Sequence, residues 1–490
     1  MNAEQGERRA IVREATAFSL ASYLFQLISV CRGFVVAWFL GPALYGVWNI
    51  FKTFLETGNY VTAGSAQAVA RELPFNKAQG RDQENQRITA STLAMCIAVS
   101  TLCGIAAAAF SLLEVAAPYR LEIRLAAITF ILNAVHLYVP NQLKGEKKIF
   151  LLAKYYIVYA LLNSLFGLLL MVYWGISGLL VGMIIASTLL TGWLLWQRHL
   201  PTRPSLHWPT SRSLIGIGFP ILFVAIAPKL MASLDKLIIF TLIDSVATGY
   251  YSMAAFFSET INYIPLALST VLFPRLMYQK GKGTDLTTMG YLYDKPMMFL
   301  AGLIPVLLGL LVLNIPVVIK TLLPEYTAAV PVLQILLAGL FFTVIWSVPR
   351  GLLVVFDKQR IFIVAIPLLL LVGALLNVLA IVLGYGIIGV ACASVLFYCA
   401  VSTMANLYVL GILQKTRGEK WRTMLRIHLP LVYTVAGVVL LQRYLHLDNE
   451  WLESLLRSVA FLVFCLPLMY YVDRKVQLVA LLRAALFKPA

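Results

Sequence analysis

Long apolar runs recur along this chain from end to end, and they constrain its fold more than any other feature. Each run has about 18 residues or more, which is enough to cross a bilayer as an α-helix. The chain is 60% hydrophobic and 12% charged, whereas soluble domains are about 45–50% apolar and about 25% charged. This composition excludes a large water-soluble enzyme and predicts an all-α polytopic membrane protein.

We predict about 14 transmembrane helices. They cover roughly 16–40, 44–70, 88–112, 121–142, 149–174, 177–197, 213–243, 248–275, 295–318, 327–350, 361–383, 387–411, 425–444 and 452–472. Several predicted outer turns are very short, among them Gly41-Pro42-Ala43, the turn at Gly175 and Gly384-Tyr385-Gly386. An even number of spans places both termini on the same side of the membrane.

The basic residues are distributed unequally between the two sides. Most of the 39 Lys and Arg residues fall in one alternate set of loops and in the two tails. The opposite set holds Arg120, Arg124, Lys320 and Arg443. Because cytoplasmic loops are enriched in Lys and Arg, this asymmetry predicts that both termini are cytoplasmic. It also accounts for the net charge of +17 without a nucleic-acid partner.

An internal repeat relates the two halves of the chain. The stretch Tyr45–Tyr60 resembles Thr248–Tyr263 at an offset of 203 residues, and Ala160–Asn163 resembles Ala374–Asn377. Gly175–Gly178 similarly resembles Gly386–Gly389. Each span of the first half therefore matches the span six places later, in the same orientation.

The repeat predicts two six-helix lobes related by a pseudo-two-fold axis along the membrane normal. We place an N-lobe at residues 1–212, a C-lobe at 213–413, and two extra helices with a basic tail at 414–490. Parallel repeats of this kind are a transporter architecture, with substrate sites near mid-membrane between the halves.

Polar side chains line one face of the second predicted span. Asn49, Lys52, Glu56 and Asn59 follow one another at spacings of three, four and three residues, which places them on one side of a helix. The eighth span repeats the stripe as Ser252, Glu259 and Asn262, with Ala255 in place of Lys52.

Further charges lie on the two spans that precede these stripes. Arg32 is on the first span, and Lys229, Asp235 and Lys236 are on the seventh, where Asp235 is the repeat equivalent of Arg32. Because charges inside a membrane usually face a cavity or a partner, we predict one shared cavity. Its predicted substrate-binding residues are Arg32, Lys52, Lys229, Lys236, Asn49, Asn59 and Asn262.

The carboxylates Glu56, Asp235 and Glu259 leave two roles open: salt-bridge partners, or sites that couple transport to a proton or sodium gradient. For Lys52 and Glu56 there is also a simpler interpretation, an i,i+4 pair that neutralises itself while helices pack. No catalytic residues, metal site or bound cofactor are predicted. His136 is expected to be packed or hydrogen-bonded, and Arg457 to reach toward the nearby membrane surface.

Several stretches carry a resemblance to a known family. They are Leu40–Trp48, Leu234–Ile239, Thr248–Ala254, Ile264–Arg275 and Leu323–Ala329. On these, the chain resembles the polysaccharide-biosynthesis flippases of the Wzx type, within the superfamily that includes the multidrug MATE exporters and the lipid II flippase. The resemblance implies a bacterial inner-membrane protein that flips a polyprenyl-diphosphate-linked oligosaccharide to the outer leaflet by alternating access. The flipped repeat units would serve assembly of an O-antigen, capsule or exopolysaccharide.

The same resemblance implies a cationic central cavity, for which Arg32, Lys52, Lys229 and Asp235 are the matching positions, and it implies a polysaccharide polymerase and other assembly proteins as partners. Ala255 departs from the pattern, because it leaves the stripe of the second half without a cation. Three alternatives remain: a MATE-like cation-coupled exporter of small molecules, a membrane polymerase or ligase, and a scaffold that does not transport.

Overall fold

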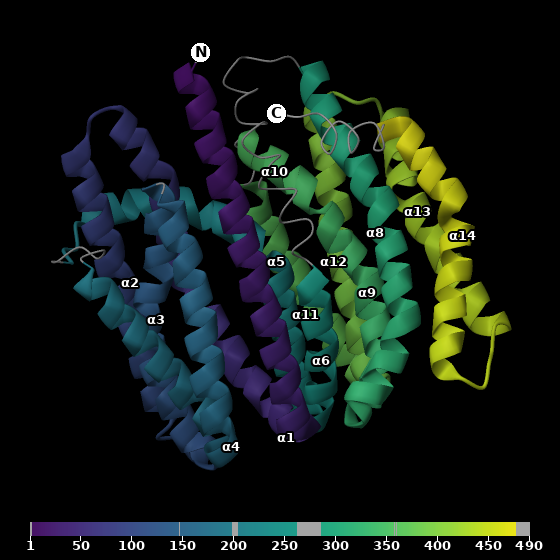
Figure 1. Cartoon of the computed structure of the whole chain (residues 1–490), viewed down its shortest axis with the longest axis horizontal. Coiled ribbons are helices and arrows are strands. Elements are labelled where there is room, and N and C mark those ends of the chain that lie inside the picture. The colour runs from purple at the N-terminus through teal and green to yellow at the C-terminus, as the bar shows by residue number, and fades with distance from the viewer. Residues whose placement is uncertain are drawn as a thin grey trace. The chain divides into compact units, whose positions relative to one another are not determined.

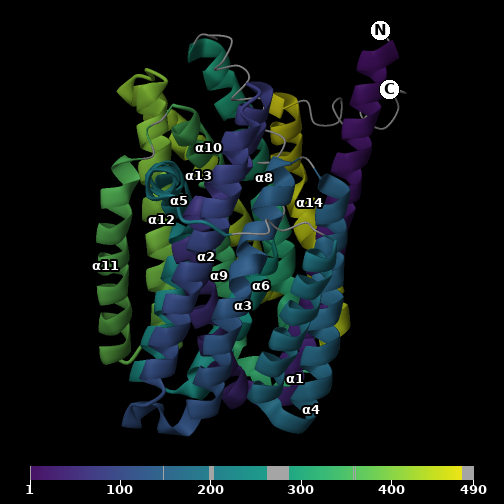
Figure 2. The same cartoon turned by 90° about the vertical axis from the view of Figure 1, so that its left-hand side faces the viewer.

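The computed structural model describes residues 2–146, 148–197, 204–261, 286–356, 358 and 360–476. All regular structure in this part is helical, and the chain divides into two compact units, Met1–Ile226 and Ala227–Ala490 (Figures 1 and 2). Each predicted span overlaps a described helix, although the end of the eighth, residues 262–275, lies outside the described residues. The all-helical, multi-pass class is confirmed, whereas the lobe boundaries at residues 212 and 413 stay predictions.

The first unit is built from four long helices and the beginning of a fifth. They are α1 (Asn2–Ala78), α2 (Asp82–Phe110), α3 (Arg120–Gly145), α4 (Ile149–Trp196) and α5 (Trp208–Leu242), with a 3-10 turn at Glu114–Tyr119. Helix α1 packs on α2, α3 and α4. A buried apolar cluster that includes Leu93, Tyr138, Leu143 and Leu190 forms part of the core of this unit.

Two of these helices each contain two predicted spans, and a glycine divides them. Gly41 in α1 has φ 65° and ψ 173°, and Gly175 in α4 has φ 52° and ψ −127°. A side chain at positive φ is strained, so glycine is suited to reversing the chain within a single residue. The short turns predicted at Gly41 and Gly175 are confirmed.

The second unit contains the remainder of α5 and eight further described α-helices. These are α6 (Ser245–Ile261), α8 (Leu286–Leu322), α9 (Val330–Ile345), α10 (Ser347–Val355), α11 (Ile361–Val382), α12 (Gly386–Ile412), α13 (Arg417–Tyr444) and α14 (Glu450–Val476), with a 3-10 turn at Pro324–Ala329. Helix α12 packs on α9 and α11, and α6 packs on α9.

Helices α13 and α14 form a hairpin beside α8 (Figure 1). The ring of Phe461 fills the space beside Gly309 of α8, and Phe464 stacks on Tyr433 with ring centroids 4.5 Å apart. Midway along the contact, Asn314 of α8 donates to Ser458 Oγ at 2.8 Å and accepts from Ser454 Oγ at 2.8 Å. Small residues and paired polar groups are what hold helices together where no hydrophobic force acts between them.

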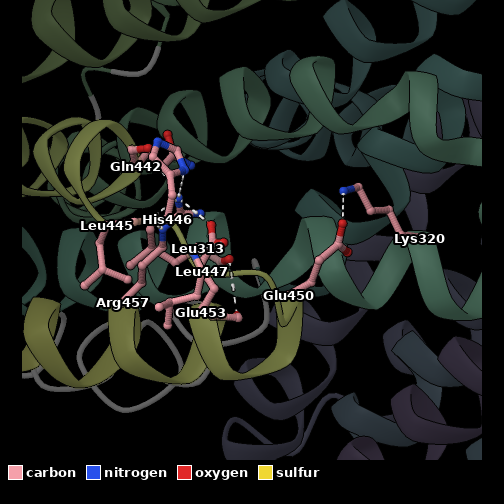
Figure 3. A network of polar contacts seen from close by, with 10 residues as sticks. Leu313, Lys320, Gln442, Leu445, His446, Leu447, Glu450, Glu453 and Arg457 are labelled. Atoms are coloured by element: carbon pink, nitrogen blue, oxygen red, sulfur yellow. Dashed lines mark hydrogen bonds and ion pairs between the residues drawn. The ribbon is translucent and has the colours of Figure 1, made fainter.

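Arg457 secures this hairpin at the end where α13 leads into α14 (Figure 3). Its guanidinium donates to the carbonyl oxygens of Leu445, at 2.7 and 3.0 Å, and Gln442, at 3.3 Å, and it pairs with Glu453 at 2.5 Å. These carbonyls lie at the C-terminus of α13, where a helix has acceptors without intrahelical donors. The Arg457 side chain, which extends from α14, therefore caps the C-terminus of α13. The prediction that it reaches toward the membrane surface did not include this role.

Candidate functional site

The predicted polar stripe of the second span lies on the second half of α1. The Lys52 Nζ atom is 3.7 Å from Glu56 Oε1, so the two form the i,i+4 ion pair of the simpler interpretation. Asn49 is buried and its Nδ2 atom donates to the Tyr45 carbonyl oxygen at 2.9 Å, whereas Asn59 is half-buried.

The stripe is open on the side that its own unit does not cover. The Lys52 and Glu56 side chains are 37% and 44% exposed, while Thr53 and Leu55 beside them are buried. Lipid tails cannot solvate an ion pair, and charged groups in membrane helices face water or protein instead. This face of α1 is therefore polar and suited to an aqueous pathway.

Arg32 lies on the first half of α1 and packs against α4. A Cβ atom built on Gly167 would be 3.2 Å from Arg32 Nη2, so this glycine makes room for the guanidinium. The Nε and Nη2 atoms of Arg32 are buried, and they find no hydrogen-bond partner among the described residues. Tyr159 of α4 is the side chain that interacts with it electrostatically. A buried guanidinium without an acceptor is costly, and an anion would satisfy it.

Asp235 on α5 is the centre of a second cluster, in the second unit. Its carboxylate is fully buried and accepts three hydrogen bonds from neutral donors on three helices. Tyr251 Oη on α6 donates to Oδ2 at 2.5 Å, Ser394 Oγ on α12 donates to Oδ2 at 2.6 Å, and Asn377 Nδ2 on α11 donates to Oδ1 at 2.7 Å. The next residue, Lys236, is buried and interacts with the carboxylate electrostatically.

The internal repeat relates these two clusters to each other. Asp235 is the repeat equivalent of Arg32, and Asn377 is the equivalent of Asn163, which lies one helical turn from both Tyr159 and Gly167 on α4. In the second unit Asn377 binds Asp235 directly, while in the first unit Asn163 is buried and its Oδ1 atom has no partner among the described residues. The two halves thus place opposite charges at one equivalent position.

The remaining predicted site residues fall outside these clusters. Lys229 is exposed on α5, and Ser233 one turn later donates to its carbonyl oxygen at 2.9 Å. The backbone of Glu259 is helical, but its side chain lies outside the described part of the structure, as does the whole of Asn262.

His136 is hydrogen-bonded, as predicted. Its Nδ1 atom is 2.6 Å from the Tyr155 hydroxyl, and its Nε2 atom is 3.3 Å from the Ser187 carbonyl oxygen. Because a carbonyl only accepts, Nε2 carries the proton and Nδ1 accepts from Tyr155. Both ring nitrogens are occupied, so this histidine is a structural link between α3 and α4.

The uncharged residues that surround Arg32 and Asp235 were not predicted from the sequence. Tyr251, Ser394 and Asn377 come from three different helices, and spacing along a single helix cannot find them. The repeat did carry a signal, because the Ala374–Asn377 match to Ala160–Asn163 marks Asn377 as equivalent to a residue on α4. Gly167 carries no chemical group, so nothing in its type indicates that it makes room for Arg32.

The fold has clear counterparts among solved structures. The lipid II flippase MurJ in an inward closed conformation has a TM-score of 0.71 at 14% identity, over 94% of this chain and 99% of that one. An inward-facing multidrug resistance MATE transporter of the MOP superfamily scores 0.66 at 13% identity, over 80% of this chain and 96% of that one. A MOP superfamily transporter from Pyrococcus furiosus scores 0.60 at 13% identity, over 83% and 96%.

These matched structures are of flippases and transporters, not enzymes, and they confirm the predicted resemblance to that superfamily. No curated protein matches the chain in sequence. A family model described as "Polysaccharide biosynthesis protein" matches residues 35–331, which is more than half of the 490 residues. The chain belongs to this polysaccharide biosynthesis protein family and has the fold of the MOP-superfamily transporters.

Proposed function

We propose that this protein is a flippase for a lipid-linked oligosaccharide. It moves polyprenyl-diphosphate-linked sugar repeat units from the cytoplasmic to the outer leaflet for assembly of a surface polysaccharide such as an O-antigen, capsule or exopolysaccharide. The protein resides in the bacterial inner membrane with both termini cytoplasmic, and it works beside a polysaccharide polymerase and other assembly proteins. The family match and the transporter fold support a role in polysaccharide export.

The observation that carries the proposal is that the buried Nε and Nη2 atoms of Arg32 are unsatisfied among the described residues. In the first unit Lys52 is neutralised by Glu56, while the Nε and Nη2 atoms of Arg32 have no acceptor among the described residues. A planar guanidinium donates two parallel hydrogen bonds to a phosphate, so a diphosphate is an anion of the right chemistry. The polar stripe of α1 supports a path for the hydrophilic sugars.

Asp235 is the coupling site in this mechanism. Its carboxylate can take a proton directly, and together with the hydroxyl oxygens of Tyr251 and Ser394 beside it, it offers oxygen ligands of the type that bind hard cations such as sodium. Occupation by either cation neutralises the buried charge and changes the hydrogen bonds among α5, α6, α11 and α12. Binding that favours one arrangement of these helices would drive alternating access.

The strongest alternative is a MATE-like exporter of small molecules, which the buried carboxylate Asp235 favours. The unneutralised Arg32 disfavours cationic cargo, because a like charge in a low-dielectric environment repels it. A polymerase or ligase of the same pathway is less well supported, since the matched structures are of flippases and transporters.

A complementation experiment tests the role of Arg32. Cells that lack the protein receive wild type, Arg32→Ala, Arg32→Lys or the control Arg212→Ala, which removes an exposed arginine of the same unit. We expect Arg32→Ala to abolish surface polysaccharide at wild-type membrane abundance, Arg32→Lys to restore it partly because the charge returns without the planar fork, and the control to export normally. Normal surface polysaccharide in Arg32→Ala would overturn the proposal.

A further inference from the structure

Helix α13 presents a continuous face that its own unit leaves uncovered. The buried side of the helix packs into the second unit through Met424, Ile427, Pro430, Thr434 and Val438. On the opposite side, exposed residues recur once per turn, singly or in adjacent pairs, and they are Trp421, Arg422, Leu425, Arg426, Leu429, Val432, Val435, Ala436, Val439 and Leu440. We call this set the outer stripe. From Leu429 to Leu440 it is wholly apolar, which is the character of a lipid-facing surface.

The spacing of the arginines along α13 matches the thickness of a bilayer. Arg426 and Arg443 are separated by about 26 Å of helix, and Arg422 and Arg443 by about 32 Å, at 1.5 Å per residue. The hydrocarbon core is about 30 Å thick. Exposed aromatic residues, Trp421 and Tyr444, lie at the two ends, where such rings favour the interface. Arg422 and Arg426 therefore bracket the edge of the hydrocarbon on the basic side.

The acidic residue of this segment, Glu419, takes its hydrogen bonds from the helix cap and also interacts electrostatically with Lys415 and Arg422. Glu419 closes a capping box at the start of α13, where its Oε2 atom accepts from Thr416 N at 2.8 Å and from Thr416 Oγ1 at 2.9 Å. The Nζ atom of Lys420 lies over the end of α12, 3.4 Å from where a Cβ on Gly411 would be. Asp294 of α8 lies near enough to interact electrostatically with Arg426, and also with Lys415.

A clear excess of positive charge remains around the stripe. Residues 415–426 contain five cations, Lys415, Arg417, Lys420, Arg422 and Arg426, against the single carboxylate Glu419. Asp294 adds one more carboxylate to this end of the unit. Such clusters beside a transmembrane helix attract anionic lipids.

We propose that Arg422 and Arg426 form a binding site for the headgroup of an anionic glycerophospholipid in the leaflet on the basic side. Residues four apart on a helix are neighbours at about 5–6 Å, so the two guanidiniums reach one phosphate group from adjacent turns. Trp421 lies at headgroup level, and the acyl chains follow the apolar part of the stripe. This site is independent of the cargo, and it would exist whether or not the protein flips an oligosaccharide.

Native mass spectrometry of the full-length protein tests the site. The purified protein is titrated in detergent with phosphatidylglycerol or phosphatidylcholine, in wild type, in the double variant R422Q/R426Q, and in the double variant R417Q/K420Q. The last is a matched control, because it removes the same charge from the same segment outside the proposed pair. We expect wild type to retain phosphatidylglycerol over phosphatidylcholine, and R422Q/R426Q to lose this retention by about fivefold or more.

The control R417Q/K420Q is expected to retain phosphatidylglycerol as wild type does. An equal loss in both double variants would show diffuse charge attraction, and no loss in R422Q/R426Q would show that the pair binds nothing. Either result overturns the proposal. A third result would also overturn it: a polyprenyl diphosphate that displaces phosphatidylglycerol from wild type at equal concentration but not from R422Q/R426Q. The pair would then be a binding site for the transported lipid.

Discussion

At the scale of single residues, the two halves of the chain carry opposite charges at one repeat-equivalent position. One equivalent position carries Arg32 in the first unit, where the guanidinium packs beside Gly167 of α4, and Asp235 in the second unit, where Asn377 donates to the carboxylate. The carboxylate has three hydrogen-bond donors, whereas the Nε and Nη2 atoms of the guanidinium have no acceptor among the described residues. A duplicated helix pair has thus acquired opposite charges, which suits binding of an anion by one half and of a cation by the other.

Gly167 tests whether the position of Arg32 matters as well as its charge. A valine at this position would displace the guanidinium, because even a Cβ atom would be 3.2 Å from Nη2. We expect Gly167→Val to reduce surface polysaccharide to the level of Arg32→Ala, measured in complemented cells at equal membrane abundance. Gly192→Ala is the control on the same helix, since a Cβ there meets open space. Wild-type export by Gly167→Val would contradict the placement of Arg32.

Tyr251 tests the hydrogen bonds around Asp235. Tyr251→Phe removes the hydroxyl that donates to the buried carboxylate at 2.5 Å, and the loss of such a partner costs about 1–3 kcal/mol. We expect a lower Tm for the purified protein than in Tyr250→Phe, a neighbouring change that keeps the ring contact of Tyr250 with Tyr326. Equal Tm values in the two variants would mean that the carboxylate does not depend on this donor.

At the scale of elements, two ion pairs lie at the same end of the α13–α14 hairpin, one made by Arg457 and one by Lys320 (Figure 3). Arg457 and Glu453 are 14% and 16% exposed, and Arg457 also caps α13, whereas Lys320 and Glu450 are 47% and 52% exposed. Exposed pairs contribute about 0–1 kcal/mol, while breaking a largely buried pair costs about 3–5 kcal/mol.

We therefore expect Arg457→Met to lower the free energy of unfolding by about 2–4 kcal/mol, because its pair with Glu453 is not completely buried. Lys320→Met, the matched change in the exposed pair, should lower it by about 1 kcal/mol at most. Thermal unfolding of the two purified variants compares them. A larger effect of Lys320→Met would show that the hairpin is held mainly at α8.

Most elements could be predicted from the sequence, because apolar length specifies a membrane helix and glycine specifies a tight reversal. The turns at Gly41 and Gly175 followed from residue type and position. The cap that Arg457 forms did not, because it depends on how the ends of α13 and α14 meet in space. The pairing of Lys52 with Glu56 was open in advance for the opposite reason: spacing alone permits both an ion pair and a free cation.

At the scale of the whole molecule, the charge asymmetry predicts which side each loop occupies. In a chain whose Cys31 and Cys392 are replaced by serine, we expect Asp448→Cys to react with a membrane-impermeant thiol reagent in intact cells. Gly418→Cys, on the basic side, should react only after the membrane is permeabilised. Both positions are exposed, so access depends on the side of the membrane. The reverse pattern would invert the topology.

The fold and the family could be predicted from patterns that extend over the whole chain. Of the candidate site, only the charged residues could be recognised in the sequence. Arg32 and Asp235 were recognisable because a charge in an apolar span is conspicuous in any membrane sequence. The surroundings of Asp235 were not, because Tyr251, Asn377 and Ser394 are ordinary polar residues until three helices bring them to one carboxylate.

The most direct test of flipping is the leaflet distribution of the lipid-linked oligosaccharide in cells that lack this protein. We predict that complete, unpolymerised repeat units accumulate on the cytoplasmic leaflet, and that wild type but not Arg32→Ala restores their transfer. Accumulation of single repeat units on the outer leaflet would instead indicate a lost polymerase or ligase. An absence of lipid-linked intermediates on both leaflets would likewise contradict the flippase and favour an exporter of small molecules.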